Sequence, residues 1–397
     1  MITYFGLAVF LAGFCLVANR LDTTIITAPM VFLGAGTALG YAGLMPELAT
    51  ELALHRIAEI ALIVLLFLDA AKIDATELRR RHVWPARMLL IGLPLGFVLG
   101  TGLGWFLLPG WPLAAIALIA AILVPTDAAL GQPVVSNEAV PVRTRRALTV
   151  ESGLNDGMAL PLVLLMAAFA APMAMSPPGG WVFFGLKQII LGPMAGLTVG
   201  CIGGIALLWA KRVHATSETY EGIGALALAA AAYLAAGLIG GNGFIAAFAA
   251  GLGFGAIVRG KCAFVYEFTE GEGQILSWTS FFLIGIVLVP EAIAHLTPLT
   301  LILILTSLLV VRPLAIWLSL MGTDAATNTR LFMGWFGPRG LATALFALLV
   351  AEQLDHELAE QVLHIAINAV WISAILHGLT AAPFAKWYGA RAAEPTS

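Results

Sequence analysis

The chain has 397 residues, of which 60% are hydrophobic and only 11% are charged, with a formal net charge of −3. This composition and the mean hydropathy of +0.95 argue against a nucleic-acid partner and leave little chain for a soluble domain. We predict an all-α polytopic membrane protein, with one transmembrane domain over residues 1–397 and no soluble regulatory domain.

Apolar runs follow one another with short polar connections, and a spanning helix needs roughly 20 apolar residues. The sequence predicts about 13 transmembrane helices. In chain order they cover approximately 2–19, 24–44, 57–71, 86–108, 111–136, 147–170, 183–209, 219–239, 243–258, 273–290, 298–320, 331–352 and 362–385.

Two of these spans are interrupted. Pro125 lies in the span 111–136. Pro338 lies in the string Gly337-Pro338-Arg339-Gly340 in the span 331–352. Broken backbone at membrane depth is tolerated only where it is buried in protein or lines water. A pair of broken helices in corresponding places indicates a transport site between inverted repeats. We predict repeats over 1–170 and 219–386, joined by a linker helix over 183–209.

The distribution of basic residues predicts the orientation, because cytoplasmic loops are enriched in Lys and Arg. One set of alternate loops holds nearly all of them, including Arg79, Arg80, Arg81, Arg143, Arg145, Arg146, Lys211 and Arg212. The opposite set holds Arg56 and Lys187. We therefore expect an N-terminus outside, a cytoplasmic C-terminus, and a location in a bacterial inner (plasma) membrane.

A small set of charged residues lies inside apolar runs, namely Asp127, Glu151, Asp156, Arg312 and Arg339. A charged side chain at the centre of a spanning helix costs about 2.5–3.5 kcal/mol on insertion scales. Such groups usually face a cavity and mark an ion or proton pathway. The alternative for the two aspartates is polar contact between helices without transport.

The span 147–170 carries the densest polar pattern. Residues four apart share one face of a helix, which pairs Glu151 with Asn155 and Ser152 with Asp156. Carboxylates and hydroxyls suit a hard cation, and Asp127 and Asp156 are the Na⁺ candidates. The predicted ion- and proton-binding residues are Asp127, Asp156, Thr126, Ser152 and Asn155.

A carboxylate must be deprotonated to bind a cation, so proton and cation compete for the same group. This competition is the minimum requirement for exchange. Arg312 stays charged and needs an anionic partner at that depth. We predict that Glu151 is this partner and that the two residues form a structural salt bridge. Arg339, beside Pro338, is expected to support the carbonyls of the broken helix or to pair with another acid.

Several strings of residues resemble those of one known family. They are Thr126-Asp127, Glu151-Ser-Gly-Leu-Asn155-Asp156-Gly, Val-Arg312-Pro, Gly337-Pro-Arg339-Gly, and the segment around Phe67 and Asp69. In order and separation they look like those of monovalent cation:proton antiporters of the NhaP-like branch, relatives of animal sodium/proton exchangers.

The resemblance implies a core domain and a dimerisation domain, an elevator-like motion, and a homodimer. It implies that Asp156 is the ion- and proton-binding carboxylate, with Asp127 as its partner. Asn155, rather than Asp, before Asp156 is similar to the electroneutral branch. Ala128 and Gly153 depart from the family pattern, and both loosen the backbone near the site.

We expect a secondary antiporter that exchanges a monovalent cation for H⁺, with Na⁺ as the first candidate for the cation. We expect no cofactor and no enzymatic activity. K⁺ and Li⁺ are the alternative cations. An intramembrane aspartyl protease or a passive cation channel is the alternative from a different class. The Tyr-Asp and Gly-x-Gly-Asp elements that such a protease needs do not occur in the sequence.

Overall fold

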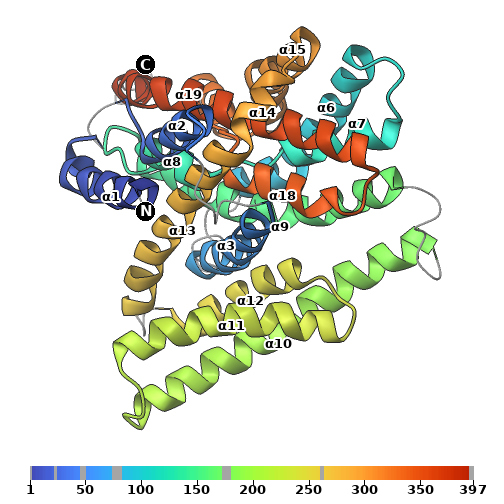
Figure 1. Ribbon diagram of the computed structural model, residues 1–397. Helices are drawn as coiled ribbons and strands as arrows, with labels where there is room; N and C mark the ends of the chain where they lie inside the picture. Colours follow the sequence, from blue (N-terminus) through green and yellow to red (C-terminus); the bar gives the residue numbers. More distant parts are fainter. Residues whose placement is uncertain are drawn as a thin grey trace.

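The computed structural model describes residues 2–21, 25–44, 51–73, 83–171, 180–259 and 263–392. Within these ranges every regular element is a helix (Figure 1), which confirms the predicted class. In lipid a helix satisfies all of its backbone hydrogen bonds internally. The basic cluster Arg79, Arg80 and Arg81 lies outside the described residues.

The first half of the chain contains α1 (Ile2–Leu21), α2 (Ala28–Tyr41), α3 (Glu51–Lys72), α5 (Val83–Arg87), the π-helix η1 (Met88–Gly92), α6 (Leu93–Leu107), α7 (Leu113–Leu123), α8 (Ala128–Val135) and α9 (Val142–Ala170). The middle contains α10 (Gly180–Arg212), α11 (Glu218–Leu238), α12 (Gly243–Val258) and α13 (Ala263–Val287). The last part contains α14 (Val289–Ala294), α15 (Pro298–Thr306), the π-helix η3 (Ser307–Val311), α16 (Arg312–Ser319), α17 (Thr327–Trp335), α18 (Leu341–Ala351) and α19 (His356–Ala392).

Among the described residues, six segments are long and apolar enough to cross a membrane by length and composition: Val83–Leu107, Val142–Ala170, Gly185–Arg212, Glu218–Leu238, Pro298–Ser319 and His356–Arg391. Shorter apolar helices fall within other predicted spans, so the total of about 13 remains a prediction. Large apolar side chains face outward, including Leu16, Phe106 and Leu238, which are 87%, 85% and 89% exposed. A lipid-facing surface accounts for such side chains, which would be unusual on a soluble protein.

The helices pack in two groups. The scaffold group contains α2, α3, α10, α11, α12 and α13, and the crossover group contains α6 to α9 and α15 to α19. In Figure 1 α10, α11 and α12 lie side by side as one layer. The helix predicted as a linker, α10, packs along α12, because Gly196 lies against the backbone oxygen of Ala246. Gly251 likewise brings α12 onto α3 at Phe67. Small residues that let backbones approach are typical of membrane helix packing.

The two predicted interruptions are present, and they meet. Residues 124–127 separate α7 from α8, and residues 336–340 separate α17 from α18. The backbone N–H of Asp127 donates to the carbonyl oxygen of Pro338 at 2.9 Å. Each break therefore supplies a hydrogen-bond partner to the other, where a continuous helix would have used its own backbone.

A second local feature also occurs in both halves. Each of the π-helices η1 and η3 is followed closely by a proline, Pro94 and Pro313 respectively. The N–H of Leu93 bonds to the carbonyl of Met88, and that of Arg312 to Ser307, each five residues back. A π-turn inside an α-helix frequently marks a functional site. The boundaries of the repeats themselves remain a prediction.

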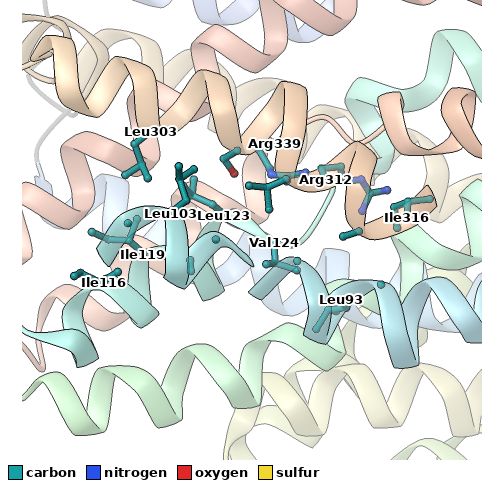
Figure 2. A pocket seen from close by; sticks show the side chains of 18 of the residues that line it. Leu93, Leu103, Ile116, Ile119, Leu123, Val124, Leu303, Arg312, Ile316 and Arg339 are labelled. Carbon is teal, nitrogen blue, oxygen red and sulfur yellow. The ribbon is translucent and has the colours of Figure 1, made fainter. Parts of the chain in front are cut away.

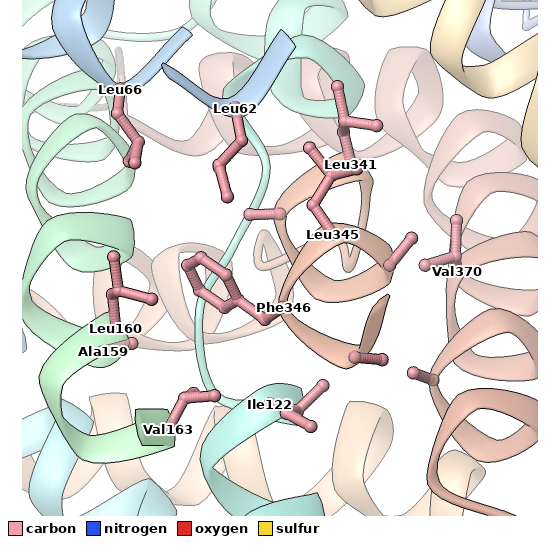
Figure 3. Packing of buried hydrophobic residues seen from close by; sticks show 14 of the residues in the cluster. Leu62, Leu66, Ile122, Ala159, Leu160, Val163, Leu341, Leu345, Phe346 and Val370 are labelled. Atoms are coloured by element: carbon pink, nitrogen blue, oxygen red, sulfur yellow. The ribbon is translucent and has the colours of Figure 1, made fainter. Parts of the chain in front are cut away.

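The apolar core surrounds α18 (Figure 3). Phe346 is fully buried, and Leu62 of α3, Leu160 of α9 and Ile122 of α7 lie around it. Among membrane helices such a side chain stabilises the fold through close van der Waals packing, because lipid is as apolar as the protein interior. This packing fixes α18, which begins at the second break, against the helices that carry the candidate site.

Candidate ion-binding site

Helix α9 presents the predicted polar face to the interior. Glu151, Ser152 and Asn155 are all buried, and Asp156 is half-buried. The i, i+4 spacing places Asn155 one turn above Glu151, and its amide Nδ2 lies 3.4 Å from Glu151 Oε1. The sequence pattern therefore predicted correctly which side chains share this face.

Thr126, in the first break, joins that break to α9. Ser152 Oγ donates to the backbone carbonyl of Thr126 at 2.8 Å, and Asn155 Nδ2 donates to its hydroxyl at 2.6 Å. The break leaves this carbonyl without a helical partner, and Ser152 satisfies it. Thr126, Ser152 and Asn155 thus form one connected network beside the break.

Glu151 and Arg312 form the ion pair that the sequence suggested. Arg312 Nη1 donates to Glu151 Oε1 at 2.9 Å and Nη2 to Oε2 at 3.1 Å, with the two residues 7% and 3% exposed. Nη2 also lies 3.4 Å from the carbonyl oxygen of Phe336 in the second break. Two parallel bonds fix the guanidinium plane, so the pair links α9, α16 and the second break.

Asp127 is placed at the point where the breaks cross. Its Oδ1 accepts from the N–H of Leu130 at 3.2 Å, and its Oδ2 accepts from the N–H of Leu341 at 2.6 Å. These N–H groups belong to the first turns of α8 and α18, which attract negative charge. Gly340 leaves the space for this carboxylate, because a Cβ there would overlap it. The role of Asp127 as an ion ligand stays a prediction, and this helix-capping contact was not predicted from the sequence.

Asp156 differs from Asp127 in its contacts. Its Oδ1 is buried and has no hydrogen-bond partner among the described residues. A buried carboxylate oxygen without a donor is costly unless a proton or a cation compensates it. Asp156 also interacts electrostatically with Asp127, Asp69 and Glu151, so negative charge is concentrated here.

Asp69, near the end of α3, is a carboxylate that the predicted site omitted. Its charge interacts with those of Asp127 and Asp156, and it approaches from the scaffold group. The available signal was an acid in the apolar run Leu-Leu-Phe67-Leu-Asp69-Ala. Gly153 of α9 faces the same place, since a Cβ there would lie 3.6 Å from the backbone oxygen of Asp69. The departure at Gly153 therefore leaves room between α9 and α3.

Arg339 supports the second break from inside. Its Nη1 donates to the carbonyl of Gly337 at 2.6 Å, and its backbone N–H donates to Ser373 Oγ at 2.7 Å. Ser373 is also 3.0 Å from Nδ1 of the buried His377. Of the two expected roles for Arg339, the structure shows the contact with a broken-helix carbonyl.

Figure 2 shows a small cavity beside Arg312 and Arg339, bordered by apolar side chains of α6, α7 and α15 such as Leu103, Ile119 and Leu303. Its volume is about 30 Å³, which is room for about two waters. The guanidinium groups thus lie between this apolar cavity and the crossing breaks.

Two broken helices that cross beside buried carboxylates define a class of helical membrane transporter. The family model described as "Sodium/hydrogen exchanger, transmembrane" matches residues 6–387. The chain belongs to this sodium/hydrogen exchanger family.

Curated relatives agree with that assignment. The chain is 27% identical over 388 residues to the K⁺/H⁺ antiporter NhaP of Alkalimonas amylolytica, covering 94% of this chain and 64% of that protein. It is 27% identical over 343 residues to the K⁺/H⁺ antiporter NhaP2 of Shewanella oneidensis, covering 83% and 57%. The chain thus spans roughly 57–64% of the length of these relatives.

The fold is similar to that of the sodium proton antiporter MjNhaP1 from Methanocaldococcus jannaschii at pH 8. The TM-score is 0.79 at 18% sequence identity, and the match covers 98% of each chain.

Proposed function

We propose that this protein is a secondary antiporter that exchanges a monovalent cation for a proton at Asp156. The observation that carries the proposal is the buried Oδ1 of Asp156, which has no donor among the described residues while neighbouring acids concentrate negative charge around it. Either a proton or a cation compensates this oxygen, and the two compete. Family membership supports the same activity.

Asp127 has a different role in this proposal. Its two oxygens are already engaged by backbone N–H groups of α8 and α18, which stabilise its negative charge. It remains charged through the cycle and attracts the cation, while Asp156 alone alternates between proton and cation. Thr126 and Ser152 offer oxygens on the same side, and Asp69 adds a carboxylate from the scaffold group.

One titrating carboxylate implies electroneutral exchange of one cation for one proton. A net charge moved per cycle would couple to voltage at about 2.3 kcal/mol per 100 mV. Exchange should therefore keep the same rate when a membrane potential is clamped. A steep dependence on potential would show that a second group, Asp127 or Asp69, also carries a proton.

Na⁺ is the cation we put first, and K⁺ is the second candidate because the curated relatives above are named K⁺/H⁺ antiporters. Both cations take oxygen ligands, so the types of ligand do not distinguish Na⁺ from K⁺. The size of the binding cavity decides between them. We further propose an N-terminus outside, a cytoplasmic C-terminus, a homodimer, and a bacterial inner membrane. The exclusion of enzymatic activity belongs to the same proposal.

The test is dequenching of a pH dye in proteoliposomes with Na⁺, Li⁺ and K⁺ added in turn. We expect cation-dependent proton movement that Asp156→Asn removes and that Asp355→Asn, at an exposed loop carboxylate, leaves intact. Cation flux without proton movement would indicate a passive channel. Equal activity of the two variants would remove Asp156 from the site.

A further inference from the structure

A second cluster of metal-ligating side chains lies away from the crossing breaks. Glu291 lies in α14, and His295 directly follows that helix, four residues after Glu291. The third residue, His364, lies in α19. One ligand atom from each residue lies within 4.8 Å of the others. His364 Nε2 is 4.0 Å from Glu291 Oε1. Two helices distant in sequence therefore bring two imidazoles and a carboxylate together.

The two histidine rings are arranged in parallel. Their centroids are 4.5 Å apart and their planes differ by 6°. His295 Nδ1 lies 3.0 Å from the backbone carbonyl of Glu291. A carbonyl oxygen only accepts, so this contact favours the tautomer with its proton on Nδ1. Nε2 then carries the free lone pair, the arrangement that metal-binding histidines use.

The donor set indicates which metal fits. Two imidazole nitrogens and one carboxylate oxygen, with water in fourth place, suit tetrahedral Zn²⁺. Mg²⁺ and Ca²⁺ prefer oxygen ligands throughout, so they fit this cluster less well. Ligand atoms around Zn²⁺ at about 2.1 Å are about 3.4 Å apart. Closing the cluster to that spacing needs rotation of the exposed side chains of Glu291 and His295, which moves the two stacked rings apart.

We propose that Glu291, His295 and His364 form a Zn²⁺ site that fastens α14 to α19. Helix α14 is the connection between α13 of the scaffold group and α15 of the crossover group. Helix α19 belongs to the crossover group and packs against α18. A bound metal thus restrains the connecting segment against the group that carries the breaks. This site is separate from the antiport site and does not depend on it.

The test is a titration of the purified full-length chain with Zn²⁺ alone, followed by calorimetry. We expect one Zn²⁺ per chain, and a Kd at least about 10-fold higher in His295→Gln and in His364→Gln. His356→Gln is the matched control, because His356 is an exposed histidine on α19 whose Nδ1 lies 3.3 Å from Glu360. Its Kd should stay within about twofold of the unaltered chain.

Thermal unfolding separates a lost site from a damaged fold. Without metal, the three variants should unfold at the same temperature as the unaltered chain. With saturating Zn²⁺, the melting temperature should rise for the unaltered chain and for His356→Gln only, because a ligand stabilises the state that binds it. Zn²⁺ binding as tight in His295→Gln and His364→Gln as in the control would overturn the proposal, and so would the absence of stoichiometric binding.

Discussion

Each of the two breaks lies between two short helices, but the breaks carry opposite charges. The break at 124–127 carries an acid, Asp127, whose charge is satisfied by N–H groups of both α8 and α18. The break at 336–340 carries a base, Arg339, whose guanidinium bonds to the carbonyl of Gly337 in its own break. The two breaks therefore have different functions. The acidic break faces the polar side of α9, and the basic break holds the crossing in shape.

The largest effect should come from the carboxylate on the acidic side. Asp156→Asn cannot alternate between proton and cation, so we expect exchange to fall by more than about 100-fold. The melting temperature should stay near that of the unaltered chain, because Asp156 Oδ1 has no hydrogen bond to lose among the described residues. Proteoliposome exchange and a thermal melt on the same preparation measure both. If Asp156→Asn still exchanges at a near-normal rate, Asp156 is not the group that carries the proton and the cation.

The next effect concerns the ion pair that reaches both breaks. Glu151→Ala or Arg312→Ala leaves a buried charge without its partner, which typically costs about 3–5 kcal/mol. Folded yield and melting temperature should fall in each variant more than apparent cation affinity changes. A double-mutant cycle on unfolding free energy should give a coupling of at least about 0.5 kcal/mol. Simple additivity of the two losses would mean that the pair does not hold the crossing together.

A smaller loss is expected for the capping contact. Asp127→Asn keeps one acceptor oxygen and places an NH₂ group where the second oxygen was, so one of the N–H groups of Leu130 and Leu341 loses its partner. An unsatisfied buried donor costs about 1–3 kcal/mol. We expect impaired exchange together with reduced stability, in contrast to Asp156→Asn. If Asp127→Asn melts like the unaltered chain, the cap is energetically unimportant and Asp127 acts purely as a ligand.

The smallest effect concerns Asp324, in the loop between α16 and α17, and its partner Arg143 in the first turn of α9. Arg143 Nη2 donates to Asp324 Oδ1 at 2.9 Å, and the Arg143 guanidinium lies over the Trp84 ring. The hydrogen bond from Arg143 holds the pKa of Asp324 below its usual value. Asp324→Asn should therefore lower the unfolding free energy by less than about 1 kcal/mol, as for other exposed pairs.

The sign of its pH dependence follows from the lowered pKa. The unfolded chain takes up the proton first as pH falls, so the contribution is present above about pH 4 and is lost as pH falls through the native pKa. Melting curves of the unaltered chain and Asp324→Asn should converge toward acid pH. Curves that diverge toward acid pH would contradict the assignment.

The sequence predicted the helical class, the two interruptions and the polar face of α9, because helical spacing and proline positions are local properties. The pairing of Glu151 with Arg312 followed from a simple requirement, since a charge at that depth needs a partner. The Asp127 cap on Leu341 was out of reach, because it joins residues more than 200 positions apart through backbone groups. The approach of Asp69 depends in the same way on how α3 packs against α9.

The π-helix η3 has a consequence for how Arg312 is aimed. A π-turn holds one more residue than an α-turn, so it acts as a one-residue insertion within a continuous helix. If the same residues were wound as a regular α-helix, everything upstream would rotate relative to Arg312 by about 100°. The guanidinium could then keep its contact with Glu151 only if α15 turned its lipid-facing side inward. The width of that single turn therefore fixes which surface of the helix meets lipid while its arginine stays at the crossing.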